Sequence, residues 1–182
     1  MARNERCIWR ESGVLWNFSI KKITMVFVVL GTQKNQFRRM LEMVDELVTS
    51  CPINEPVIAQ IGYTQYESKN FQCFKMVDEI DFQKYVAEAS VIITHSGSGA
   101  LFSSIKHRKK IIAVARLKRY GEMVDDHQTE LVRKLTKDGY ILDGTHSIVD
   151  AWKKLPGFIP RPYDFSNTIV EVLKKWIDND LI

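Results

Sequence analysis

The chain has 182 residues, 45% of them hydrophobic and 26% charged, with a formal net charge of +4 at pH 7. This length suits one well-buried domain and not two full-sized ones, and so mild a charge favours anionic small molecules or a membrane surface over a dedicated nucleic-acid role. Three widely spaced cysteines without a CxxC pair argue against disulfides or zinc and favour a reducing compartment.

The amino-terminal part of the sequence divides at residue 22. Residues 1–22 show no clear period, so we expect a loosely ordered extension, or alternatively an element that packs on the domain or on a partner. A single domain is expected over residues 23–182. Its apolar start resembles a signal peptide but lacks a small-residue cleavage site. We interpret residues 25–30 as a buried strand, with Gly31 and Thr32 in the turn after it.

Short β-branched runs and apolar residues at helical spacing alternate through the rest of the chain. They predict a helix at 35–49, strands at 57–61 and 71–76, a helix at 80–88, strands at 91–94 and 111–115, a helix that runs on beyond residue 128, a strand at 140–142, and helices at 148–155 and 165–178. This alternation predicts an α/β fold with a doubly wound, mainly parallel, Rossmann-like sheet. The last helix is strongly amphipathic and could pack on its own sheet or on a partner.

The stretch from residue 91 to residue 128 carries the strongest functional signal. Its first strand leads directly into His-Ser-Gly-Ser-Gly at residues 95–99, and a helical pattern follows. A glycine-rich turn before a helix points backbone N–H groups and a positive dipole end at an anion. The strand at 111–115 then leads into a polar loop, and ligands of open α/β sheets bind at such strand ends.

A dinucleotide-binding fingerprint is the rival interpretation of the glycine loop. That fingerprint needs a third small residue where Phe102 stands, and it belongs in the first strand–turn–helix unit instead of a late one. A nicotinamide-dependent oxidoreductase is therefore disfavoured.

The glycine loop, the helix and strand after it, and Asp-His-Gln at 126–128 resemble the C-terminal domain of family 28 glycosyltransferases, from about residue 25 to about residue 144. The loop with Tyr-Gly-Glu at 120–122 and Asp-Asp-His-Gln at 125–128 is most similar to bacterial polysaccharide galactosyltransferases, which are related to the cytosolic subunit of the split dolichol-linked N-acetylglucosamine transferase. The resemblance implies the C-terminal half of a GT-B glycosyltransferase, in which the loops hold the diphosphate and sugar of a nucleotide sugar.

By this resemblance, we expect a donor-binding subunit of an inverting glycosyltransferase that transfers galactose from UDP-galactose to a polyprenyl-diphosphate-linked sugar in capsule or exopolysaccharide synthesis. UDP-N-acetylglucosamine is the alternative donor, and a non-catalytic nucleotide-sugar-binding subunit is the alternative from another class. The expected partner is a membrane-anchored enhancer or half-transferase subunit, docked by the helix at 165–178. It would hold this cytoplasmic chain at the inner face of the cell membrane, and no nucleic acid is expected.

The resemblance also implies roles for individual residues. Residues 95–99 would embrace the diphosphate, and Arg116 would meet a phosphate or the partner. Residues 126–128 would hold the sugar, with Glu122 as a further contact. Ser103 stands where family members commonly place a glutamate that grips the ribose, which weakens the expected nucleotide contacts. The predicted donor-binding residues are Gly31, Thr32, His95, Ser96, Gly97, Ser98, Gly99, Ser103, Arg116, Glu122, Asp126, His127 and Gln128.

The sequence contains no cluster of metal-ligand residues, so we expect neither a metal nor another cofactor. In this architecture, helix dipoles and basic groups stabilise the leaving diphosphate. Two-domain relatives carry the catalytic base on an N-terminal domain, for which this chain has no room. We expect a partner to supply the base, with His95 or His127 as the alternatives.

Overall fold

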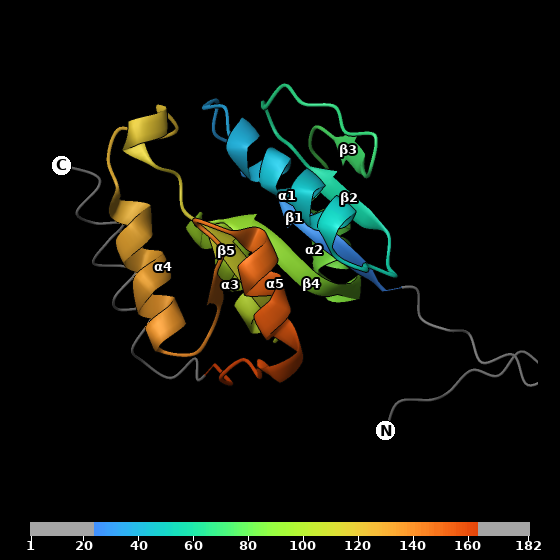
Figure 1. Cartoon of the computed structure of the whole chain (residues 1–182), viewed down its shortest axis with the longest axis vertical. Helices are drawn as coiled ribbons and strands as arrows, with labels where there is room; N and C mark the ends of the chain where they lie inside the picture. Colours follow the sequence, from blue (N-terminus) through green and yellow to red (C-terminus); the bar gives the residue numbers. More distant parts are fainter. Residues whose placement is uncertain (1–23, 164–182) are drawn as a thin grey trace, which may run out of the picture.

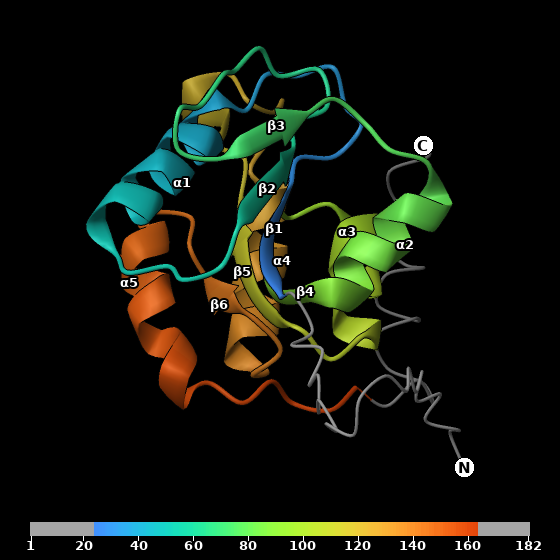
Figure 2. The same cartoon turned by 90° about the vertical axis from the view of Figure 1, so that its right-hand side faces the viewer.

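The computed structural model describes residues 24–163. The extension predicted at 1–22 and the helix predicted at 165–178 lie outside the described residues. Within them, six strands form one sheet that helices cover on both faces (Figures 1 and 2). No helix in this part of the chain combines the length and the apolar character needed to cross a membrane.

The predicted elements of this part of the chain are present, with differences of a few residues at their ends. The strands are β1 (Met25–Val29), β2 (Val57–Gln60), β3 (Gln72–Phe74), β4 (Ala89–His95), β5 (Lys110–Val114) and β6 (Leu142–Asp143). The helices are α1 (Arg38–Ser50), α2 (Glu79–Glu88), α3 (Ser98–Lys106), α4 (His127–Lys137) and α5 (Ile148–Lys154), with 3-10 turns at Lys118–Tyr120 and Leu155–Gly157. Helix α1 begins three residues later than predicted. The carbonyl groups of Asn35 and Gln36 accept hydrogen bonds from the Arg116 side chain and not from N–H groups of the helix.

The strand order confirms the doubly wound sheet. All five pairings among the described strands are parallel, and the order is β3-β2-β1-β4-β5-β6. In this order, winding reverses between β1 and β4, and ligands of such sheets bind in the crevice beyond that point. The register pairs Val29 with Thr94, so the loops that follow these two strands emerge side by side.

The central strands are apolar throughout because both faces of the sheet are covered. Val26 and Val28 pack in one cluster with α1 and α5, whereas Phe27 and Val29 face α2 on the opposite side. Helices α3 and α4 cover β5 in a third cluster. Figure 2 shows α1 and α5 on one face of the sheet and α2 and α3 on the other. Each fully buried side chain of this kind stabilises the fold by about 1.5–3 kcal/mol.

Candidate functional site

A cavity of about 360 Å³ opens at the carboxyl edge of the sheet, beside the loops that follow β1 and β4. It therefore occupies the crevice at which doubly wound sheets bind their ligands. Its walls are formed by Val29, Gly31, Thr32, Gln33, Gln60, Val77, Glu79, Phe82, His95, Gly97, Ser98, Gly99, Ala100 and Gln128. Seven residues of the predicted donor site line the cavity: Gly31, Thr32, His95, Gly97, Ser98, Gly99 and Gln128.

His95, the last residue of β4, is 7% exposed. The backbone N–H of Gly31 donates to its Nδ1 at 3.0 Å, so the ring proton is on Nε2. The Val29 carbonyl lies 3.3 Å from the same nitrogen. We assign the shorter contact as the hydrogen bond, because the N–H of Gly31 can only donate and Nδ1 must therefore accept. Burial, reinforced by the charge of Arg116, lowers the pKa of His95 to about 4. The imidazole is therefore neutral at pH 7.

Two glycines make room for the His95 ring. A Cβ atom on Gly31 would lie 2.5 Å from Nε2, and one on Gly97 would overlap the same atom. Real Cβ atoms do not come this close to another heavy atom, so any other residue would displace the ring. The Nε2–H group therefore stands between two stretches of bare backbone in the cavity wall, where it can donate to an anionic ligand.

Helix α3 begins at the same wall. Its N-cap residue is Gly97, which has no side chain to cap the helix, and its first turn holds no acidic residue. Ser98, Gly99 and Ala100 of this turn all line the cavity. The unsatisfied N–H groups and positive dipole end of such a turn favour a negative charge. His95 and α3 together form a candidate anion site.

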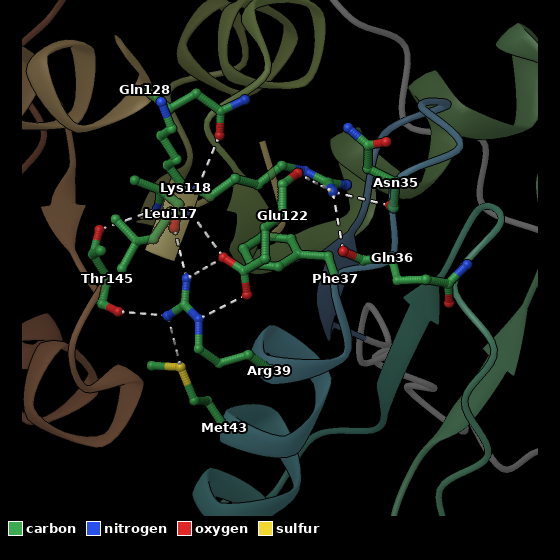
Figure 3. A network of polar contacts seen from close by, with 12 residues as sticks. Asn35, Gln36, Phe37, Arg39, Met43, Leu117, Lys118, Glu122, Gln128 and Thr145 are labelled. Atoms are coloured by element: carbon green, nitrogen blue, oxygen red, sulfur yellow. Dashed lines mark hydrogen bonds and ion pairs between the residues drawn. The ribbon is translucent and has the colours of Figure 1, made fainter. Parts of the chain in front are cut away.

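Gln128 enters the cavity from the second position of α4. Its Oε1 accepts a hydrogen bond from the backbone N–H of Arg116 at 3.0 Å (Figure 3). Because a backbone N–H can only donate, this bond sets which end of the amide is the oxygen. The NH2 end of Gln128 is left to donate to a ligand oxygen.

Arg116 and Glu122 were predicted as ligand contacts, but the structure places both away from the cavity lining. Arg116 is 1% exposed, and its Nη1 donates to the carbonyl groups of Asn35, Gln36 and Glu122 at 3.0–3.5 Å. Glu122 is 5% exposed and forms an ion pair with Arg39. Both side chains thus bond within the protein, and neither belongs to the cavity lining.

Two predicted serines also lie outside the cavity lining. Ser96 is buried, and its Oγ atom has no hydrogen-bond partner among the described residues. Ser103 on α3 donates to Oε1 of Gln83 on α2 at 2.9 Å, so it bridges two helices. The structure therefore does not bring these two hydroxyls together with the residues that line the cavity.

The start of α4 brings only one of the three predicted sugar-binding residues to the cavity. Asp126 occupies the N-cap position, but its side chain makes no capping bond and instead accepts from the backbone N–H of Lys118 at 2.8 Å. His127 is largely exposed, with Nε2 3.5 Å from the carboxylate of Asp125. Neither Asp126 nor His127 lines the cavity, and Gln128 alone of these three residues does.

The structure adds three polar residues that the sequence analysis missed: Gln33, which follows Thr32 in the turn after β1, and Gln60 and Glu79. Gln60 ends β2, and Glu79 begins α2, where its carboxylate accepts from Gln83 Nε2 at 2.6 Å. Both line the cavity. A polar residue at the end of an apolar strand was the available signal for Gln60. A single glutamate at the start of a helix gave none for Glu79, because acidic residues favour that position in any helix.

A second hollow, of about 750 Å³, lies at the opposite edge of the sheet. Its walls include Ser90 and Lys110, where β4 and β5 begin, and Trp152 and Leu155 at the end of the α5 region. Although it is the larger of the two, it faces the amino ends of the strands, which is not where open α/β sheets bind ligands. The smaller cavity is therefore the candidate functional site.

Comparison with known proteins identifies the family. Residues 25–154 match the family described as the glycosyltransferase family 28 C-terminal domain. A relative, the UDP-N-acetylglucosamine transferase subunit ALG13 of Cryptococcus neoformans var. neoformans serotype D, is 29% identical over 103 residues, which make up 54% of this chain and 50% of the relative. The chain thus spans about half the length of the curated relatives it matches.

Solved structures confirm the fold. An NMR solution structure of ALG13 has a TM-score of 0.53 at 15% identity, over 79% of this chain and 90% of that one. SnogD of Streptomyces nogalater has a TM-score of 0.53 at 13% sequence identity, over 81% of this chain and 39% of SnogD. MurG of Acinetobacter baumannii has a TM-score of 0.51 at 15% identity, over 74% of this chain and 40% of MurG. The shared fold thus makes up most of the solved ALG13 chain and one part of the longer SnogD and MurG chains. The family match to residues 25–154 shows that the chain belongs to the glycosyltransferase family 28 C-terminal domain family.

Proposed function

We propose that this chain is the donor-binding subunit of a UDP-sugar-dependent glycosyltransferase, with UDP-N-acetylglucosamine as the donor. Membership of the family supports a glycosyltransferase, and the name of the ALG13 relative supports both this donor and the subunit organisation. The observation that carries the proposal is the cavity beyond β1 and β4. There the His95 Nε2–H group, the start of α3 and the amide of Gln128 converge on one space.

The diphosphate would bind at the start of α3. First-turn N–H groups and the Nε2–H of His95 would meet its oxygens, and hydrogen bonds to charged groups of this kind contribute about 1.5–3 kcal/mol each. The same preorganised donors would stabilise the negative charge that develops on the leaving UDP. We propose that transfer needs no metal and no other cofactor, so treatment with EDTA should leave donor binding unchanged.

The sugar and the ribose would be held by the polar residues on either side of this anion site. The NH2 group of Gln128 would donate to a sugar hydroxyl. Glu79 would accept from the ribose hydroxyls, a contact for which Ser103 is not placed, because it lies outside the cavity lining. Glu79→Gln should then weaken binding of UDP and of UDP-sugar equally, as measured by calorimetry.

We propose that the partner supplies the base that deprotonates the acceptor hydroxyl. His95 is a poor base, because its Nδ1 accepts from Gly31, its Nε2 carries the proton and its pKa is lowered to about 4 by burial. His127 lies outside the cavity lining. The base would therefore come from a membrane-anchored subunit that binds a lipid-linked acceptor and holds this chain at the cytoplasmic face of the membrane, with residues 165–178 as the proposed docking segment.

UDP-galactose is the second candidate donor. The sequence of the loop at 120–128, which resembles polysaccharide galactosyltransferases, favours it, and the product would then be a galactoside in capsule or exopolysaccharide synthesis. The two sugars differ at C2, which carries an acetamido group or a hydroxyl, and in the configuration at C4. Calorimetry on the full chain with UDP, both UDP-sugars and NAD separates the candidates. Binding of NAD without a response to uridine nucleotides would overturn the proposal.

A transfer assay distinguishes catalysis from binding alone. In membranes that contain the partner, Gln128→Ala should abolish sugar transfer because the sugar loses its oriented donor. Gln72→Ala is the matched control, since Gln72 is an exposed glutamine on β3 outside the cavity lining. Transfer that survives Gln128→Ala while donor binding is lost would favour a non-catalytic nucleotide-sugar-binding subunit.

A further inference from the structure

We propose that Arg39 is a positioning residue for the donor sugar, which it affects through Gln128 without touching the ligand. This inference rests on the proposed function, because it assumes that Gln128 contacts the sugar of a UDP-sugar. In this inference, the ion pair between Arg39 and Glu122 serves to orient the side-chain amide of Gln128 in the cavity. The sequence analysis had placed Glu122 in the donor site itself.

Arg39 stands on the first turn of α1 and joins three segments that are distant in sequence (Figure 3). Its Nη1 donates to the Thr145 carbonyl and its Nη2 to the Ala115 carbonyl, each at 2.8 Å. Nε and Nη2 also bind the two carboxylate oxygens of Glu122 at 2.9 Å. This planar fork holds the end of β5, the loop after it and the loop before α5 in one arrangement.

Glu122 extends this network to Leu117 in the loop after β5. Besides the two bonds from Arg39, its Oε2 accepts from the backbone N–H of Leu117 at 2.8 Å. The Glu122 side chain is 6% exposed and that of Arg39 is 20% exposed, so solvent screens the pair little. Ala115 and Leu117 are therefore both anchored, the first by Arg39 directly and the second through Glu122.

Arg116 lies between these two anchored residues, and its backbone N–H is the group that orients Gln128. Because Ala115 and Leu117 are held on either side, the N–H of Arg116 points in a fixed direction. This direction fixes the position of the Gln128 Oε1 atom that accepts from it. If Arg39 were removed, the N–H would be free to shift, and the amide could rotate away from its position at the cavity. An error of about 1 Å in a positioning group can cost up to about 100-fold in activity.

The test is a double-mutant cycle between Arg39 and Gln128, measured by calorimetry on the full chain with UDP-N-acetylglucosamine and with UDP. Arg39→Met should weaken UDP-sugar binding about tenfold. Gln128→Ala should weaken it at least as much, and the double variant should bind no more weakly than Gln128→Ala alone. UDP without the sugar should bind all three variants as it binds the wild type, because the amide acts on the sugar.

Arg38→Met is the matched control. Arg38 precedes Arg39 on the same helix, its side chain is 66% exposed, and it forms an ion pair with Glu42 at the surface. Its replacement should change neither affinity. If Arg39→Met alone does not fold, the cycle is run with Arg39→Met/Glu122→Gln, which leaves no unpaired carboxylate and keeps an acceptor for Leu117. Folding is checked by near-UV circular dichroism.

The possible outcomes are distinct. Additive losses from the two substitutions, or an equal loss of UDP binding in Arg39→Met, would overturn the inference and show that Arg39 supports only the fold. Unchanged UDP-sugar binding in Gln128→Ala would also overturn it, while the proposed function would stand on binding by the wild-type chain. Absence of uridine-nucleotide binding by the wild type would overturn both.

Discussion

Two polar regions at the carboxyl edge of the same sheet use their hydrogen-bond donors in opposite ways. Beyond β1 and β4, the Nε2–H of His95 and the first turn of α3 border a cavity, and glycines clear the space around them. Beyond β5, the guanidinium groups of Arg39 and Arg116 donate to carbonyl and carboxylate oxygens of the protein itself. The first region can bind a ligand, whereas the second positions a residue of the cavity wall, because the backbone N–H of Arg116 binds Gln128.

The comparison shows that charge at a strand end is a weak guide to ligand binding. Arg116 carries a full charge and follows β5 directly, yet its side chain is buried over the ring of Phe37 at 4.6 Å. His95 is neutral and nevertheless faces the cavity. What separates them is their surroundings: Nη1 of Arg116 donates to three carbonyl groups of the protein, although its buried Nε has no partner among the described residues, whereas His95 borders the cavity.

Removal of Arg39 should disrupt the second region and lower stability more than any other change considered. Arg39→Met leaves the nearly buried carboxylate of Glu122 unpaired, which should lower the free energy of unfolding by about 3 kcal/mol or more. Arg38→Met removes only a surface ion pair and should cost about 0.5 kcal/mol or less. Urea denaturation of the two variants measures the difference. Equal losses would mean that the buried pair adds nothing beyond a surface one.

Acid should weaken the first region through His95. Its pKa is lowered from 6.5 in the unfolded chain to about 4 in the fold, so the neutral form is stabilising above pH 6.5. That stability is lost as the pH falls from 6.5 towards 4, by about 3 kcal/mol in total, because the unfolded state takes up the proton first. Denaturation curves across this range should show a steeper loss in the wild type than in His95→Asn. Parallel curves would contradict the buried neutral imidazole.

Filling the space beside His95 should block the cavity. In Gly97→Ala, the new Cβ atom overlaps Nε2 of the ring, so the ring must move and the anion site is lost. We expect UDP-sugar binding to weaken about 100-fold. Gly157→Ala is the control, because no atom lies within 4 Å of its added Cβ and it is outside the cavity lining. Wild-type affinity in Gly97→Ala would remove His95 from the proposed site.

A more modest loss is expected when the amide of Gln128, which joins the two regions, is changed. Gln128→Glu keeps an oxygen for the backbone N–H of Arg116 but replaces the donor that faces the cavity with a second carboxylate oxygen. UDP-sugar binding should weaken about tenfold, equivalent to about 1.4 kcal/mol. Calorimetry measures this change, and a glutamate that binds as well as glutamine would mean that the amide does not donate to the ligand.

The architecture could be predicted from the sequence, because strand and helix periods are local properties of the backbone. Val26 and Phe27 face opposite sides of the sheet as a buried parallel strand requires, and Met40, Leu41, Val44 and Leu47 recur at helical spacing. The glycine loop was also readable from sequence, since glycines before a helix have a local geometric purpose.

Which polar residues remain available to a ligand depends on contacts between segments that are distant in sequence. Arg39 and Glu122 are 83 positions apart, and no local pattern pairs them. Glu79 lines the cavity because the fold brings the start of α2 beside it. The carboxylate of Glu122 is instead held away from the cavity by its ion pair with Arg39. Hydrogen bonds between distant segments depend on the complete fold, whereas backbone periods depend on neighbours in the chain.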